Sequence, residues 1–282
     1  MALTGGDGVY ERYAGPGLVP VQSRCWLAFA LAELGEYQEA LDIALAAHEA
    51  ARAVQHPYSF AFTAYAVGRL HLARGSLTQA LEALQRAREL VESREIVQIR
   101  PVVNAWLGLA LTQAGRAKEG IPLIQEAAEK PVAVGGTGQG PISARLAEAL
   151  RLDGRFAAAF RAATTAVELA RRQEERGNEA AALLALADIQ AEREGATADD
   201  IERGYAEARV LASALSMRPI VAACDFGLGR FLRSVGRLEY ADRLTASARL
   251  FAEMGLTVPQ PCRALSLDTQ PTPSSDERPG LS

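Results

Sequence analysis

Apolar residues recur along most of this chain at the spacing of one helix face. Residues 101–115 show the pattern clearly, because their apolar positions fall at i, i+3, i+4, i+7 and i+8. Those positions are Val103, Trp106, Leu107, Ala110 and Leu111. Residues 77–91 follow a similar spacing. The pattern predicts amphipathic helices that pack through one apolar side.

Glycines divide these stretches at a nearly constant interval. The separations are 40, 40, 39, 41 and 41 residues (75−35, 115−75, 154−115, 195−154, 236−195) for Gly35, Gly75, Gly115, Gly154, Gly195 and Gly236. A fixed period in this range is typical of a solenoid of helical hairpins. Each glycine is expected to end a helix at positive φ, which a residue without Cβ adopts readily. The short link that follows predicts an antiparallel pair.

Small residues recur at fixed places relative to these glycines. Gly68, Gly108 and Gly229 stand seven positions before them. Alanines stand five and twelve positions after them, as Ala40, Ala80, Ala159 and Ala241, and as Ala47, Ala87, Ala127, Ala166 and Ala248. Small side chains at these places would let the two helices of a hairpin approach closely.

This arrangement resembles the tetratricopeptide repeat. The resemblance implies an all-α, right-handed superhelical solenoid of about six antiparallel helix pairs over residues 22–256. The units exceed the usual ~34 residues, and we expect the addition to lengthen mainly the second helix. HEAT and armadillo repeats have a comparable period but lack this placement of alanine and glycine.

Two segments, 216–256 and 56–91, resemble the tetratricopeptide region of maltose-regulator-like bacterial signalling ATPases and of class III nucleotide cyclase fusions. The resemblance implies a sensor or regulatory arm, with an upstream ATPase or cyclase domain as one partner. No Gly-Lys pair occurs, so the phosphate-binding motif of those ATPases is absent. We expect residues 1–21 to be poorly ordered and the Pro/Ser-rich residues 257–282 to be disordered. Neither end shows a polar cap, which predicts a piece of a larger protein or self-association.

Composition and charge exclude several classes of protein. The chain is 49% hydrophobic and 23% charged, with a net charge of −4. A basic excess, which supplies most of the affinity of nucleic-acid binders, is absent, so direct nucleic-acid binding is not expected. No apolar stretch approaches the ~18 residues that span a bilayer. Cys25, Cys224 and Cys262 form no paired framework, and no signal peptide is apparent, so we expect a cytoplasmic protein.

Candidate chemistry is sparse. His48, His56 and His71 show no metal-ligand spacing, and the glycine-rich segment 135–140 follows no strand and lacks the dinucleotide-binding pattern. We read that segment as a loop between repeats. No nucleophile–base arrangement or pair of catalytic carboxylates stands out. The sequence therefore predicts no catalytic residue, metal or cofactor, and a protein that is not an enzyme.

The first helices of tetratricopeptide hairpins line a concave groove. Counting back from each turn glycine, the residues expected to face that groove are Phe29, Tyr65, Arg69, Thr112, Gln113, Glu148, Arg151, Arg193, Arg230 and Arg233. Arginine side chains suit carboxylates and phosphates, so an acidic protein or peptide partner would fit. The alternative is solvated charge without a partner.

We therefore expect a non-enzymatic scaffold that binds a protein or peptide in its groove, within a bacterial signalling or transcription-control system. The alternative is a receptor for a small-molecule effector, using Thr112, Gln113 and Glu148 as converging polar groups.

Overall fold

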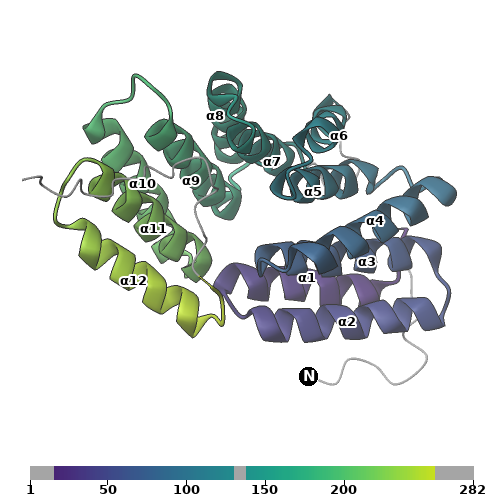
Figure 1. The fold of residues 1–282 in the computed structure, drawn as a ribbon. Helices are drawn as coiled ribbons and strands as arrows, with labels where there is room; N and C mark the ends of the chain where they lie inside the picture. The colour runs from purple at the N-terminus through teal and green to yellow at the C-terminus, as the bar shows by residue number, and fades with distance from the viewer. Residues whose placement is uncertain (1–15, 130–137, 258–282) are drawn as a thin grey trace, which may run out of the picture.

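The structure is a computed structural model, which describes residues 16–129 and 138–257. These residues form twelve α-helices and no strand (Figure 1). Odd-numbered helices are the first members of six hairpins: α1 Val19–Leu34, α3 Pro57–Ala73, α5 Arg100–Gln113, α7 Gln139–Leu152, α9 Arg176–Glu192 and α11 Arg218–Ser234. Even-numbered helices are the second members: α2 Tyr37–Ala53, α4 Leu77–Ser93, α6 Ala117–Glu129, α8 Phe156–Arg172, α10 Ala198–Ala214 and α12 Tyr240–Glu253. The predicted fold class is confirmed.

All six turn glycines lie between the two helices of a hairpin. Their φ angles run from 74° at Gly236 to 92° at Gly35, which is the left-handed region. The turns close with backbone hydrogen bonds; the N–H of Gly75, for example, donates to the carbonyl of Leu72 at 3.0 Å. The glycine period in the sequence is thus the hairpin period of the fold.

Small residues allow close packing inside the first four hairpins. A Cβ on Gly108 of α5 would lie 2.5 Å from the carbonyl oxygen of Gly120 on α6, so the two backbones touch there. The predicted alanines of α2, α4, α6 and α8 are fully or almost fully buried. In the last hairpin Ala241 and Ala248 are exposed, contrary to expectation. The reason is that α12 begins four residues after Gly236 (240−236), whereas α2 begins two after Gly35 (37−35), which changes its buried face.

The extra length of the repeat lies in both helices, not mainly in the second. Helix α3 and helix α4 each have 17 residues, as do α9 and α10. Four of the turns between hairpins also contain a residue at positive φ, and none of these four residues is glycine. They are Gln55, Glu95, Glu174 and Ser216.

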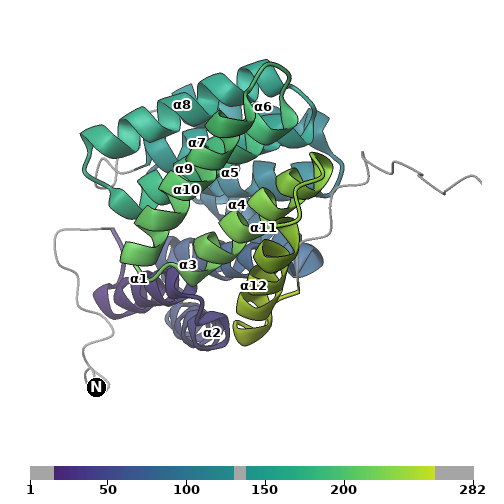
Figure 2. The ribbon, with the colours of Figure 1, turned by 90° about the vertical axis from the view of Figure 1, so that its left-hand side faces the viewer.

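The odd-numbered helices form an inner layer and the even-numbered helices an outer one. Each odd-numbered helix packs on the next, from α1 and α3 through to α9 and α11, while each even-numbered helix packs on the odd-numbered helices beside it (Figures 1 and 2). A continuous apolar core runs between the layers from α1 to α9, and a second cluster continues it to α11. This arrangement leaves the inner layer with one face that the outer helices do not cover.

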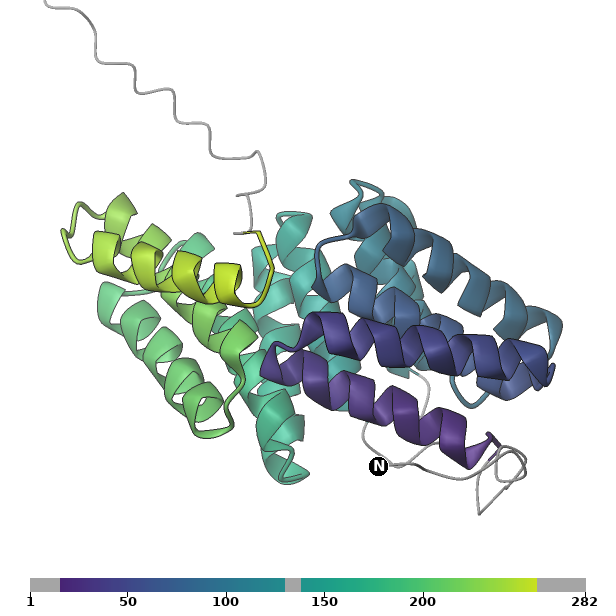
Figure 3. The same cartoon turned by 90° about the horizontal axis from the view of Figure 1, so that it is seen from below.

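The last hairpin returns to the first one (Figure 3). The Arg218 side chain of α11 donates to the carbonyl of Leu34 at 2.8 Å and to Glu36 at 2.6 Å. Met254 is buried close to Gly35, and both ends contribute to one apolar cluster. We call this set of contacts the closing contact. It covers apolar surface at both ends of the repeat, which removes part of the reason for expecting self-association.

Helix α1 begins at Val19, three residues before the predicted start of the repeat at residue 22 (22−19). The predictions for residues 1–15 and 258–282, and for residues 135–137 of the glycine-rich loop, lie outside the described residues. Gln139 and Gly140 belong to the first turn of α7. No helix among the described residues combines the length and hydropathy that crossing a membrane requires.

Candidate functional site

Two arginines and two aromatic rings from four neighbouring inner-layer helices stack on one another. The guanidinium carbon of Arg69 on α3 lies 4.2 Å from the ring centre of Phe29 on α1 and 5.1 Å from that of Trp106 on α5. The guanidinium carbon of Arg145 on α7 lies 4.9 Å from the centre of the same Trp106 ring. These are cation–π distances. We call Phe29, Arg69, Trp106 and Arg145 the arginine–aromatic stack.

Further aromatic residues support the stack from α1 and α3. Tyr65 and Phe62 are buried, and the ring of Phe29 meets them edge-on at 5.8 Å and 6.4 Å. Burial raises the pKa of Tyr65, although the nearby Arg69 and Arg145 oppose that shift. Trp26 packs on Phe29 and on Phe62, yet the residue stays 55% exposed. The predicted residues Phe29, Tyr65 and Arg69 are therefore brought together. Phe29 and Tyr65 are buried, and Arg69 packs over the ring of Phe29.

Carboxylates lie beside the two arginines of the stack. Glu33 of α1 accepts a hydrogen bond from Arg69 at 3.3 Å. Glu148 of α7 lies 3.8 Å from Arg145 and accepts from Gln113 of α5 at 3.3 Å. The predicted residues Gln113 and Glu148 thus meet at the end of the stack, where they join α5 to α7.

A second charged group joins α7, α9 and α10. Arg151 donates to Glu192 at 2.8 Å, and both side chains are partly buried. Asp188, one turn before Glu192 on α9, accepts from the Tyr205 hydroxyl at 2.7 Å. Desolvation raises the pKa of Asp188 to about 6, while Arg151 opposes the shift. The predicted Arg151 therefore sits among carboxylates, not beside the stack.

Two predicted residues are engaged away from the inner face. Thr112 is buried; its hydroxyl donates to the Gly108 carbonyl at 2.9 Å and lies close to Gly120 of α6. Arg193 lies 4.2 Å from the ring centre of Phe160 on α8, an outer helix. Both were placed in the groove by counting from the turn glycine, but the close contact between Gly108 and Gly120 brings the face of α5 that carries Thr112 against α6. The geometry gives them structural contacts between the layers.

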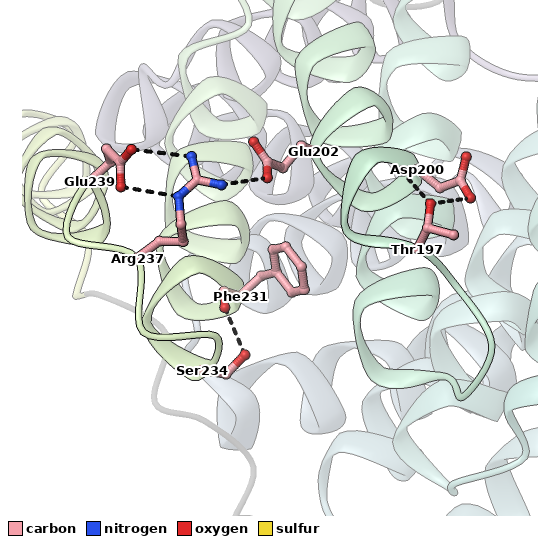
Figure 4. A network of polar contacts seen from close by, with 7 residues as sticks. All are labelled: Thr197, Asp200, Glu202, Phe231, Ser234, Arg237 and Glu239. Atoms are coloured by element: carbon pink, nitrogen blue, oxygen red, sulfur yellow. Dashed lines mark hydrogen bonds and ion pairs between the residues drawn. The ribbon is translucent and has the colours of Figure 1, made fainter.

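The C-terminal arginines separate into two settings. Arg230 lies 5.8 Å from the ring centre of Phe226 on its own helix, and Arg233 is exposed; neither forms an ion pair with the described residues. Arg237 lies beyond the end of α11. It pairs with Glu239 at 3.1 Å and with Glu202 of α10 at 3.4 Å (Figure 4). Arg237 is therefore engaged in ion pairs, unlike Arg230 and Arg233.

Trp106 and Arg145 were not among the predicted site residues. The sequence carries a signal for them, because Trp26, Trp106 and Arg145 each stand nine positions before a turn glycine (35−26, 115−106, 154−145). Trp106 also belongs to the apolar spacing of residues 101–115, so the periodicity alone places it in the core. In the structure its ring is only partly buried, between the two guanidinium groups.

Histidines and cysteines have ordinary structural places. The Nδ1 atom of His48 lies 2.9 Å from the Thr63 hydroxyl, and the His56 side chain accepts from the backbone N–H of Ser59 at the start of α3. Cys25 and Cys224 are buried free thiols, and burial raises the pKa of Cys25 to about 12. Within residues 16–129 and 138–257, no group of three or more His, Cys, Asp or Glu side chains could hold a metal ion.

Comparison with known proteins identifies a shared fold. No family model and no curated protein matches the chain. Among solved structures, Bacillus thuringiensis PlcR in complex with the peptide PapR7 and DNA superposes with a TM-score of 0.63 at 16% identity, over 76% of this chain and 77% of that one. The Rap conjugation gene regulator of plasmid pLS20, in complex with the Phr* peptide, gives 0.65 at 14% identity, over 83% of this chain and 63% of that one. The apo form of RapI gives 0.62 at 11% identity, over 83% and 84%.

The chain thus spans less than two thirds of the Rap regulator's length. At these identities the likeness concerns the fold alone, which is a tetratricopeptide-like helical repeat.

Proposed function

We propose that this protein is a non-enzymatic repeat scaffold that binds a short peptide on the inner face of its odd-numbered helices. The observation that carries the proposal is the arginine–aromatic stack, which crosses four hairpins on a face that the outer helices leave uncovered. Aromatic and arginine side chains are the residues that most often dominate binding energy at interfaces. The likeness to peptide-bound PlcR and to the peptide-bound Rap regulator supports a peptide as the ligand.

A regulatory role follows from the same reasoning. A scaffold that catalyses no reaction can regulate a partner protein only if ligand binding changes the contacts between the scaffold and that partner. The resemblance to signalling ATPases and nucleotide cyclases makes such a domain the first candidate for the regulated partner. The alternative of a small-molecule effector is weaker, because one of its three polar groups, Thr112, is buried within the α5–α6 hairpin.

Selection from a peptide library tests the proposal. The immobilised protein is incubated with random heptapeptides, and the retained peptides are identified by mass spectrometry. We expect an enriched set whose retention is lost in the double variant Arg69→Gln, Arg145→Gln. The matched control is Arg116→Gln. Arg116 is an exposed residue of the turn before α6, and it pairs with Glu119 in the first turn of that helix. Equal retention by the wild type and the double variant would refute binding at the stack, and no enrichment at all would refute peptide binding.

A further inference from the structure

The closing contact is loosely packed compared with the hairpins themselves. Helix α1 packs along α3, whereas it meets α11 near its C-terminal end, at Leu34 (Figure 3). A hollow of about 480 Å³ lies between the two ends of the repeat, lined among others by Glu36 of the first hairpin and Leu250 of the last. Inside the α5–α6 hairpin, by contrast, the two backbones touch. Two surfaces that do not interlock can separate at a smaller cost than two that do.

One arginine supplies the polar part of the closing contact. Helix α1 has no basic residue in its last turn, although the carbonyl groups at a helix C-terminus attract cations. Arg218 of α11 takes that place: its Nε donates to the Leu34 carbonyl at 2.8 Å and its Nη2 donates to Glu36 at 2.6 Å. The side chains of Arg218 and Glu36 are 36% and 54% exposed, so water and salt compete with this pair. The pair can therefore break without leaving a buried charge.

A flexible apolar side chain supplies the other part. A Cβ on Gly35 would lie 2.6 Å from the Sδ atom of Met254, so this methionine lies directly against the turn of the first hairpin. Methionine is unbranched and adapts its shape readily. Among the described residues, the last hairpin adds three buried side chains to this apolar cluster, those of Ala222, Phe251 and Met254. Separation of the two ends would thus expose few large side chains of the last hairpin.

The last turn of α1 belongs both to the closing contact and to the surroundings of the arginine–aromatic stack. Its Leu34 carbonyl accepts from Arg218, and its Glu33 carboxylate accepts from Arg69 at 3.3 Å. The other carboxylate oxygen of Glu33 lies 3.8 Å from the position of a Cβ on Gly177, at the start of α9. Because α9 packs on α11, separation of the ends would move α9 away from Glu33. Water would then reach the pair of Glu33 with Arg69 and weaken it.

We propose that the closing contact is a latch: the first and last hairpins separate and rejoin while each hairpin stays folded. The last turn of α1 couples this change to the arginine–aromatic stack. The closed form holds Arg69 over Phe29 and Trp106, and the open form loosens it. Two sites that bias one two-state element are coupled to each other. The inference names a regulation of the proposed binding face and so rests on the proposed function for its purpose, but its test needs no ligand.

Distances between two spin labels test the latch. The labels are attached to Glu39→Cys on α2 and Glu253→Cys on α12, which are exposed positions that line one hollow beside the closing contact. Cys262 is replaced by serine, and the two cysteines among the described residues are buried. We expect a short and a long distance. Arg218→Glu should lower the ratio of short to long at least about fivefold, since an ion pair and a charge-assisted hydrogen bond are lost.

The opposite result is equally clear. One narrow distance that neither Arg218→Glu nor about 1 M sodium chloride changes would overturn the inference. The salt titration uses the labelled protein with Arg218 in place, so it tests the latch even if Arg218→Glu does not fold. Added salt should lengthen the distance in that protein, because it screens the exposed pair.

A charge swap separates the latch from a general loss of stability. Glu36→Arg combined with Arg218→Glu restores an opposite pair, so the short distance should return in part. The matched control, Arg116→Glu, lies in the turn before α6 and should leave both distances unchanged. Far-ultraviolet circular dichroism and thermal unfolding check that each variant is folded. If the folded swap variant stays as open as Arg218→Glu, the ion pair does not hold the ends together and the inference fails.

Tryptophan emission tests the coupling to the stack, because Trp26 and Trp106 are the two tryptophans of the chain. Trp106 carries Arg69 at 5.1 Å, and Trp26 packs on Phe29. Emission and its quenching by acrylamide should follow the open fraction across the variants and the salt titration. Opening without a change in emission would refute the coupling. The peptide-library selection remains a separate test: its failure would refute peptide binding, whereas unchanged label distances would refute the latch.

Discussion

Arginine side chains have two different kinds of partner in this molecule: a buried carboxylate at the C-terminal end and aromatic rings in the arginine–aromatic stack. At the C-terminal end Asp225 of α11 is 1% exposed and accepts from Arg209 of α10 and Arg243 of α12, both at 2.9 Å. In the arginine–aromatic stack the guanidinium groups of Arg69 and Arg145 lie over aromatic rings, and the carboxylates of Glu33 and Glu148 lie beside these two groups. The Asp225 cluster joins three consecutive helices around a buried charge, whereas the stack crosses four hairpins at an uncovered face.

The difference shows how one residue type serves stability or recognition. A buried carboxylate is costly unless charged donors surround it, so Asp225 makes its two arginines necessary to the fold. The arginines of the stack are not required by a buried charge, and their cation–π contacts are each worth only about 0.5–1 kcal/mol at partly exposed sites. Stability should therefore depend on the first cluster, and ligand binding on the second.

The largest expected effect is that of Asp225→Ala on stability. The change removes the shared partner of Arg209 and Arg243 and leaves a cavity between α10, α11 and α12. Because both arginines are about 40% exposed and can turn to solvent (39% and 41%), we expect a loss of about 2–3 kcal/mol, below the range for fully buried pairs. Urea unfolding followed by circular dichroism measures it. A loss no greater than that of an exposed pair, as in Arg116→Ala, would contradict the comparison.

Asp188 should make a smaller, pH-dependent contribution to the free energy of unfolding than Asp225 does. Its pKa is about 6 in the folded protein and 3.8 without the fold, so the folded state holds the proton more tightly. Stability from this group is therefore lost as pH rises from about 4 to about 6, and it stays lost above that. The shift corresponds to at most about 3 kcal/mol, and because the side chain is only partly buried we expect about 1 kcal/mol.

Asp188→Asn isolates this contribution. The amide oxygen can still accept from Tyr205, and no charge is desolvated. The free energy of unfolding of the variant should therefore rise relative to the wild type between pH 4 and pH 6 and remain higher at pH 7. A constant difference across that range would show that Asp188 does not titrate as proposed.

The arginines of the stack should matter little for stability. Arg69→Gln and Arg145→Gln together remove three cation–π contacts and two ion pairs that are partly exposed. We expect a loss of about 1.5 kcal/mol, the lower end of the sum for three cation–π contacts, because exposed ion pairs contribute little and the buried Arg145 Nε loses no partner. Thermal and urea unfolding measure it. A loss equal to that of Asp225→Ala would mean that the stack is a structural element.

The fold could be predicted from the sequence because its hairpin turns use glycine. Positive φ at six places nearly demands that residue, so the period is visible. The turns between hairpins use Gln55, Glu95, Glu174 and Ser216 at positive φ, and these residue types give no such signal. The register of α12 was missed for a related reason: its start depends on a longer turn after Gly236, which residue spacing alone does not reveal.

The candidate site was only partly predictable. Counting from the turn glycines found Phe29, Tyr65 and Arg69, because these lie in adjacent hairpins with nearly equal turns. The same count misplaced Thr112, because the glycine contact between α5 and α6 brings that face against the outer helix. Trp106 was missed because a large apolar residue within an apolar spacing reads as core. Trp106 lies at the candidate site because Arg69 of α3 and Arg145 of α7 both pack on its ring. This contact depends on how neighbouring hairpins are arranged in space, which residue spacing within one helix does not show.

The closing contact extends the comparison to a third setting of arginine, that of Arg218, which should have the smallest effect on stability. Arg218 is partly exposed and joins α11 to the carbonyl of Leu34 and to Glu36, so Arg218→Ala should cost about 0.5–1 kcal/mol. Its position makes the consequence specific, because the two hairpins it joins are remote in sequence. Hydrogen exchange should speed up at the C-terminal end of α1 and at the N-terminal end of α11 together, whereas Arg116→Ala should affect only the start of α6. Faster exchange at α11 alone would mean that Met254 and its apolar neighbours hold the ends together without the arginine.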